Sequence, residues 1–95
     1  WKKIKLNKMN MKNQPDNNNF TTSDFYAAAF LVAKGYELFG INKADSRRFR
    51  FIFADEPDRA QLVSAYFAGF VEVNAKAFVT AIKELKSLMY NDAMS

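Results

Sequence analysis

The sequence predicts a small single α+β domain, and three patterns carry that prediction. The run FYAAAFLVA at 25–33 is apolar around a full helical turn. In RRFRFIF at 47–53, phenylalanine alternates as in a strand with one buried face. Apolar residues then recur at helical spacing over 78–89. Ten phenylalanines supply a core, and the expected order over residues 20–95 is α-β-β-α-(β)-α, with a hairpin packed against helices.

Residues 1–19 are expected to form a disordered tail outside this domain. The segment contains NQPDNNN, a polar stretch with a proline and too little apolar surface to order itself. It also holds five lysines and one acid, so it carries the whole net charge of +4. Residues 20–95 are therefore neutral overall, and the charge of the chain is no measure of the charge of the domain.

TTSD at 21–24 predicts a helix start, with a threonine as the cap and Asp24 near the positive end of the helix dipole. Gly35 predicts a left-handed stop after Lys34. Because 25–33 has no polar stripe, this helix is either enclosed by the domain or partly covered by a partner. Enclosure is the favoured alternative, since large exposed apolar patches are rare on monomers.

YELFGIN at 36–42 and RRFRFIFAD at 47–55 predict a β-hairpin. Alternation in the second strand places phenylalanines on one face and mostly arginines on the other. These two sets are Phe49, Phe51 and Phe53, and Arg48, Arg50 and Ile52. Since no Asn-Gly or Asp-Gly marks a two-residue turn, we expect a loop of about four or five residues around Asp45 and Ser46.

DEPD at 55–58 predicts the start of a second helix, with Asp55 or Glu56 as its cap and Gly69 as its end. The acids of this motif lie where the helix dipole favours negative charge. Helix capping therefore explains these carboxylates without a ligand.

FVEV at 70–73 is short and extended, and it is the candidate for a third strand. Asn74 then caps a last helix that runs to about Tyr90. Its buried stripe is expected to consist of Phe78, Ile82, Leu85 and Met89. A sheet with so few strands has an open edge, where another chain can pair.

The runs TTSDFYAAAFLVAKGYELFGI, FRFIFAD, LVSAYFAG and VEVNAKAFVTAIKELKSLMY cover about residues 21–90. Their pattern, T-D-x-Y-x-A-A, then F-x-F-x-D, then F-x-x-x-I-x-x-L-K-S-L, resembles a small domain-of-unknown-function family of bacteria and their phages. Ser23 stands between threonine and Asp24, which departs from the opening of that pattern. The resemblance implies a shared fold, and it supplies no active-site residues because the family is uncharacterised.

The chain has no cysteine and no histidine. It therefore has no disulfide, no thiolate or imidazole metal ligand, and no nucleophile activated by histidine. The acids that are closest in sequence, Asp55, Glu56 and Asp58, are explained by capping, so neither a metal nor another cofactor is expected. We expect a protein that is not an enzyme.

The longest apolar run has nine residues, about half of the ~20 that span a bilayer. A polar stretch separates it from the lysines, whereas a signal peptide joins its basic and apolar parts directly. We therefore expect a cytoplasmic protein that does not contact a membrane.

The best candidate site lies on the hairpin, where basic residues outnumber acids. Its members are Lys43, Arg47, Arg48 and Arg50, opposed only by Asp45. Such residues on an exposed strand contact phosphates, and this binding is mainly electrostatic. The pattern favours a small non-enzymatic domain that binds nucleic acid, DNA or RNA, with little sequence preference, or an accessory domain. The alternative is a solvated strand face that discourages aggregation through the sheet edge.

Two other hypotheses concern the apolar residues. Phe49, Phe51 and Phe53 alternate with basic residues, as in sheets that stack nucleic-acid bases, but a small domain needs these side chains in its core. The rival to nucleic-acid binding is a protein-interaction module. It would form a homodimer or dock on a larger partner through the apolar first helix, the open sheet edge or FVEV.

Overall fold

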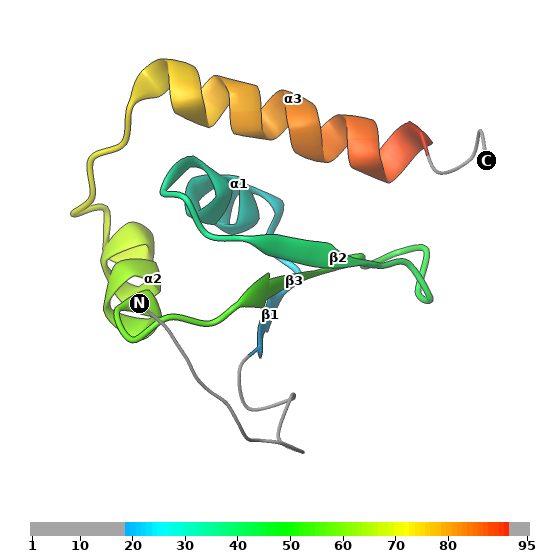
Figure 1. Ribbon diagram of the computed structural model, residues 1–95, viewed down its shortest axis with the longest axis horizontal. Coiled ribbons are helices and arrows are strands. Elements are labelled where there is room, and N and C mark those ends of the chain that lie inside the picture. The colour runs from blue at the N-terminus through cyan, green and yellow to red at the C-terminus, as the bar shows by residue number, and fades with distance from the viewer. Residues whose placement is uncertain (1–18, 92–95) are drawn as a thin grey trace.

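A three-stranded antiparallel sheet, with strand order β1-β3-β2, carries two stacked helices on one face (Figure 1). The computed structural model describes residues 19–91, with side chains up to residue 90. The elements are β1 (Asn19–Thr22), α1 (Phe25–Ala33), β2 (Leu38–Asn42), β3 (Arg50–Ala54), α2 (Arg59–Ala68) and α3 (Ala75–Asn91). The α+β class and the hairpin packed against helices are confirmed. The predicted disordered tail lies outside the described residues, except for Asn19, which belongs to β1.

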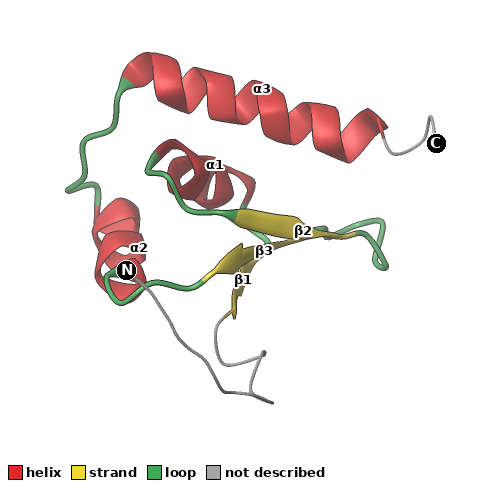
Figure 2. Cartoon of the chain, in the orientation of Figure 1, coloured by secondary structure: helices red, strands yellow, loops and turns green. Residues whose placement is uncertain are grey.

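The third strand lies elsewhere than predicted. Residues 70–73 form a connection without strand structure, and β1 is the third strand (Figure 2). β1 pairs with β3, with Phe20 opposite Phe53 and Thr22 opposite Phe51. Four residues between an asparagine run and a helix cap are too few to show a strand period in the sequence. The strand forms because β3 supplies its partners.

The core lies between the sheet and α1, and α3 packs on the other side of α1 (Figure 1). β3 is the central strand, and its side chains alternate as predicted. Phe51 and Phe53 are buried on the helix side, whereas Arg50 is exposed and Ile52 half-buried on the opposite face. Phe49 precedes the strand and is also half-buried.

α1 is the enclosed helix that its all-round apolar sequence predicts, with residues 27–31 buried. It is therefore not available as a docking surface. The cap is Asp24 and not a threonine: its Oδ1 accepts a hydrogen bond from the Ala27 N–H at 2.8 Å, and Thr22 Oγ1 accepts from the Asp24 N–H at 3.1 Å. Thr22 does not cap the helix because it belongs to β1. Gly35, with φ 97°, ends the helix as predicted.

Residues 43–49 connect β2 to β3, a longer loop than the four or five residues predicted. Side chains build turns within it. Asn42 Oδ1 accepts from the Ala44 N–H, and Asp45 Oδ1 accepts from the Arg47 N–H, both at 2.9 Å. Because these bonds satisfy backbone groups locally, the ladder of the hairpin ends at the pair of Asn42 and Arg50, and Arg47 and Arg48 lie in the loop.

α2 begins later than predicted, with Asp58 as its cap residue in place of Asp55 or Glu56. Asp55 is not the cap because its carboxylate accepts from the Arg59 side chain and from the Glu56 N–H. The predicted end at Gly69 is confirmed, with φ 83°.

α2 has no fully buried residue, so side-chain contacts with other elements hold it in place. These are the stacked rings of Phe30 and Tyr66 at 5.1 Å, the hydrogen bond from Tyr36 to Asp58, and the Arg59 guanidinium 4.1 Å from the Phe20 ring centroid. They link α2 to α1, to the segment between α1 and β2, and to β1.

α3 begins at the predicted cap, where Asn74 Oδ1 accepts from the Ala77 N–H at 2.9 Å. The predicted stripe is confirmed: Leu85 is buried, and its other members are half-buried against the core. Ala81 lies within the stripe and is also buried. In the part of the chain that the structure describes, no helix is long and apolar enough to cross a membrane.

Candidate functional site

The four basic residues predicted as the site lie at one end of the sheet, on the hairpin loop and at the first residue of β3. They are Lys43, Arg47, Arg48 and Arg50. All three arginines are exposed, and the side chain of Arg47 is 91% exposed. Its ion pair with Asp45 spans 3.7 Å between solvated groups, so it stabilises the loop little. The guanidinium groups are therefore accessible to a ligand.

Lys43 differs from the arginines because it contacts the end of α3. Its Nζ donates to the carbonyl oxygens of Leu88 and Met89 at 2.8 and 3.0 Å, and lies 5.7 Å from the centre of the Phe49 ring. A cation at this position also interacts favourably with the helix dipole. A phosphate contact by Lys43 would compete with these bonds, whereas contacts by the arginines would not.

The three arginines surround the hairpin end and do not form one row. Arg50 pairs with Asn42 and projects from the sheet face opposite to that of Phe51. Arg47 and Arg48 line a depression on the helix-covered side. The fold therefore brings Arg47 and Arg48 together and places Arg50 on the other side.

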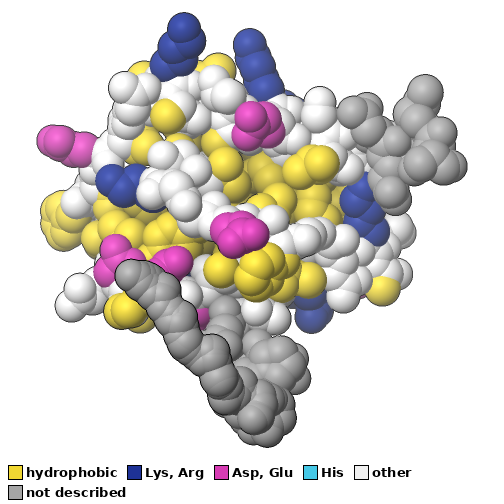
Figure 3. Space-filling view, viewed as in Figure 1, with side chains coloured by type: hydrophobic (Ala, Val, Ile, Leu, Met, Phe, Trp, Pro, Cys, Tyr) yellow, Lys and Arg dark blue, Asp and Glu magenta, His cyan; other side chains and the backbone are white. Residues whose placement is uncertain are grey.

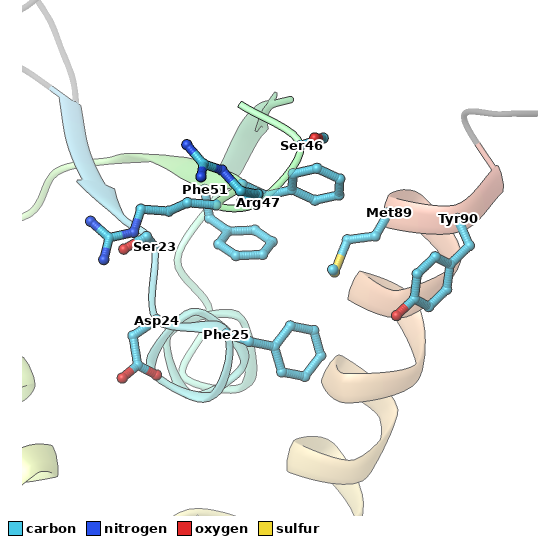
Figure 4. Close-up of a pocket in the computed structure, with 10 residues that line it drawn as sticks. Ser23, Asp24, Phe25, Ser46, Arg47, Phe51, Met89 and Tyr90 are labelled. Atoms are coloured by element: carbon cyan, nitrogen blue, oxygen red, sulfur yellow. The ribbon is translucent and has the colours of Figure 1, made fainter. Parts of the chain in front are cut away.

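That depression, an open pocket of about 610 Å³, lies between the hairpin loop, the start of α1 and the end of α3. Figure 4 shows Phe25, Phe51 and Met89 pointing toward its centre, with Tyr90 at its edge. The other lining residues are Ser23, Asp24, Ser46, Arg47, Arg48 and Phe49. Its volume is within the range of about 300–1,000 Å³ that is usual for small-molecule sites.

Charge is divided between the two ends of β3. Arg47, Arg48 and Arg50 lie at its start, and Asp55, Glu56 and Asp58 follow its end. In Figure 3, acidic side chains lie over α2 at the lower left and also in the middle of this face, and basic ones lie toward the hairpin side at the right and also at the top and left. At a rise of about 3.3 Å per residue, the two groups are roughly 15 Å apart, which is beyond the Debye length of about 8 Å at physiological salt. The acids therefore do not neutralise the arginines.

Structural contacts occupy the carboxylates at the acidic end. Asp55 accepts from Arg59 Nε at 2.9 Å, and this hydrogen bond lowers the pKa of Asp55 below its ordinary value. Asp58 accepts from the Tyr36 hydroxyl; burial of the phenol, and then this bond, raise the pKa of Tyr36. Among the residues described, no three acidic side chains form a group that could hold a metal ion.

Replacing Lys43 with methionine is expected to destabilise the domain by about 1 kcal/mol, because the helix end loses its cation and two carbonyls lose their donor. Methionine keeps much of the apolar stem, so the charge effect is isolated. Urea unfolding measures the change. Lys86→Met, an exposed lysine on α3, is the control and should change stability by less than about 0.5 kcal/mol. Equal losses in the two variants would contradict the role of Lys43.

A family model covers all of the described residues: that of a domain of unknown function, DUF5659, which matches residues 17–91. The chain belongs to this family. The match confirms the resemblance to a domain-of-unknown-function family, and its bacterial or phage origin stays a prediction. Neither the curated proteins nor the solved structures gave a significant match.

In this DUF5659 domain, sequence reasoning missed the pocket residues that lie outside the hairpin. It assigned Met89 to a core stripe and named Tyr90 as the approximate end of the last helix, yet Tyr90 is 66% exposed beside the arginines. No local sequence pattern predicts that the last turn of α3 lies next to the loop between β2 and β3. Stacking of bases on the strand phenylalanines is excluded for Phe51 and Phe53, because both are buried beneath α1.

Proposed function

We propose that this domain binds nucleic acid through its hairpin end and neutralises backbone phosphates with little readout of base sequence. The observation that carries the proposal is the division of charge along β3, which leaves Arg47, Arg48 and Arg50 exposed and away from the acids that follow the strand, with Asp45 as a weakly paired neighbour. Binding of this kind is electrostatic, salt-dependent and indifferent to sequence.

Arginine suits this role because its planar guanidinium donates two parallel hydrogen bonds to a phosphate. The exposed ion pair between Arg47 and Asp45 is weak, so a phosphate can replace the carboxylate as the partner. Arg50 projects on the other side of the hairpin, so the backbone of a nucleic acid meets positive charge on both sides. In this proposal the domain is not an enzyme and its ligand is DNA or RNA. The proposal also places the protein in the cytoplasm.

The test is binding of short DNA and RNA over a salt series from about 50 to 200 mM. The full chain is used with its five tail lysines replaced by glutamine, so that the charges of the domain decide the result. Changing Arg47, Arg48 and Arg50 together to alanine is expected to weaken binding at least about tenfold. The slope of affinity against salt should fall by about one unit per arginine.

A matched control changes Lys34, Lys76 and Lys83 to alanine, which removes the same charge from exposed positions outside the hairpin. This variant should bind almost as the parent does. The proposal fails when the parent shows no binding at the lowest salt, or when the two triple variants lose affinity equally.

Exposed aromatic residues favour a second candidate function, that of a protein-interaction module. Phe67 in α2 is 60% exposed, and Phe70, just after Gly69, is 85% exposed. Exposed aromatic side chains of this size are enriched in interfaces. Because α1 is enclosed, a partner would meet these rings or an edge of the sheet. A dimer in solution without nucleic acid, converted to a monomer by Phe67→Ser with Phe70→Ser, would support this function; a dimer unaffected by both changes would contradict it.

A further inference from the structure

The pocket beside the arginines has an aromatic edge that core packing does not explain. Tyr90, in the last turn of α3, keeps 66% of its surface exposed there, and Phe25 and Met89 are half-buried next to the same space (Figure 4). An exposed ring beside a concave apolar surface is the arrangement on which flat ligands stack. The pocket is therefore built for a planar group on this side.

Three charged side chains also line the pocket, and their charges are of opposite sign. Arg47 and Arg48 are positive, whereas Asp24 is negative and held in place at the start of α1 by its bond with the Ala27 N–H. A phosphate is attracted to the arginines and repelled by Asp24, so it belongs on the hairpin side. A group that carries N–H donors is suited to the position facing Asp24.

We infer that this pocket receives the base of an unpaired nucleotide while Arg47 and Arg48 hold the adjoining phosphates, an inference that rests on the proposed binding of nucleic acid. A base is flat, apolar on its faces and rich in hydrogen-bond donors and acceptors at its edge. Its faces match the Tyr90 ring and the apolar floor, whereas Asp24 lies on the other side of Phe25 from Tyr90 (Figure 4). The pocket volume of about 610 Å³ accommodates one nucleotide.

Pairing decides which nucleic acids reach this pocket. In a duplex the faces of the bases are covered by their neighbours, whereas unpaired bases splay out and stack on protein rings. Binding of a base in this pocket differs from stacking of bases on the phenylalanines of β3. Phe51 lies at the floor of the pocket with only 1% of its surface exposed, so it offers no ring face to a base. The stacking surface is Tyr90, which comes from α3.

The experiment compares single-stranded DNA with a duplex of equal length at one salt concentration, using the full chain with glutamine in place of the five tail lysines. The parent is expected to bind the single strand more tightly. Tyr90→Ala should weaken binding of the single strand by about tenfold and leave duplex binding unchanged. Tyr90→Phe, which keeps an aromatic ring, should bind the single strand as tightly as the parent does. Leu88→Ala is the matched control, because Leu88 is similarly exposed on α3 and does not line this pocket.

A fluorescent aminopurine in the single strand gives a second readout, since stacking on a ring quenches it. Quenching should persist in Tyr90→Phe and disappear in Tyr90→Ala. Circular dichroism checks folding, and Tyr90→Leu, which keeps bulk without an aromatic face, should show the same loss and replaces the alanine variant when that variant unfolds.

Two results overturn the inference and are distinguishable from each other. If the protein binds single strand and duplex equally, and Tyr90→Ala changes neither affinity, then the pocket does not bind an unpaired base. The proposal that the hairpin arginines bind phosphates is not contradicted by this result. If the parent binds no nucleic acid at low salt, both the phosphate binding by the hairpin and the binding of a base in the pocket are contradicted.

Discussion

Replacing Phe53 with alanine is expected to destabilise the domain by about 3–5 kcal/mol. Phe53 has no exposed surface, and it lies in the central strand opposite Phe20 and Leu38. The change removes a large apolar side chain and leaves a cavity that a close-packed core fills only in part. Urea unfolding followed by circular dichroism measures the loss. Because small domains have a total stability of about 5–15 kcal/mol, the variant should be close to unfolding.

Two companion variants make this result interpretable. Ile52→Ala changes the next residue of β3, which is half-buried on the other face of the sheet, and should cost about 1 kcal/mol. Phe53→Leu keeps an apolar side chain in the core and should remain folded enough for a complete curve. An Ile52→Ala loss as large as that of Phe53→Ala would contradict the assignment of the two faces.

Raising the pH above about 10 is expected to destabilise the domain, mainly through Tyr36. Burial of the phenol, then its hydrogen bond to Asp58 and the negative charges of Asp58, Glu56 and Asp55, raise the pKa of Tyr36 above that of an unfolded tyrosine. The unfolded chain therefore loses this proton at a lower pH than the folded domain does. The stabilisation is complete below the unfolded pKa and is lost as the pH rises from that value through the folded one.

The expected slope is about 1.4 kcal/mol of unfolding free energy per pH unit for each such group, measured by denaturant unfolding at several alkaline pH values. Tyr36→Phe should lower stability near neutral pH by about 1 kcal/mol, because Asp58 loses its donor, and should flatten the alkaline limb. Some slope remains, since burial also raises the pKa of Tyr66. Tyr90→Phe, at an exposed position, is the control, and a limb that flattens equally in both variants would refute the role of Tyr36.

Elements with a long local pattern could be predicted from the sequence. The alternation around Phe51 and Phe53, the apolar run of α1 and the stripe that contains Leu85 each repeat over several residues. The spacing of apolar residues predicts which side chains face the core, and it does so without knowledge of the elements that pack against them. The hairpin, α1 and α3 were therefore predictable, and so was the basic end of the hairpin.

Elements defined by one specific partner could not be predicted. Phe20 lies in a strand because Phe53 is opposite to it. Asp58 replaces Asp55 as the cap residue of α2 because Arg59 binds the Asp55 carboxylate. A long-range strand pairing in the first case, and a side-chain contact between residues four apart in the second, decided between two local structures with which the sequence pattern was compatible.

The candidate site divides in the same way. Arg47, Arg48 and Arg50 follow one another on one segment, so their proximity and their excess of charge were already determined by the sequence. The pocket beside them was decided only by the tertiary structure. Lys43 bonds to the end of α3 and Tyr90 lies next to the hairpin loop because α3 packs across α1. Charge along a segment is a local property, whereas a concave surface needs several elements in a definite arrangement, and only packing of the core produces that arrangement.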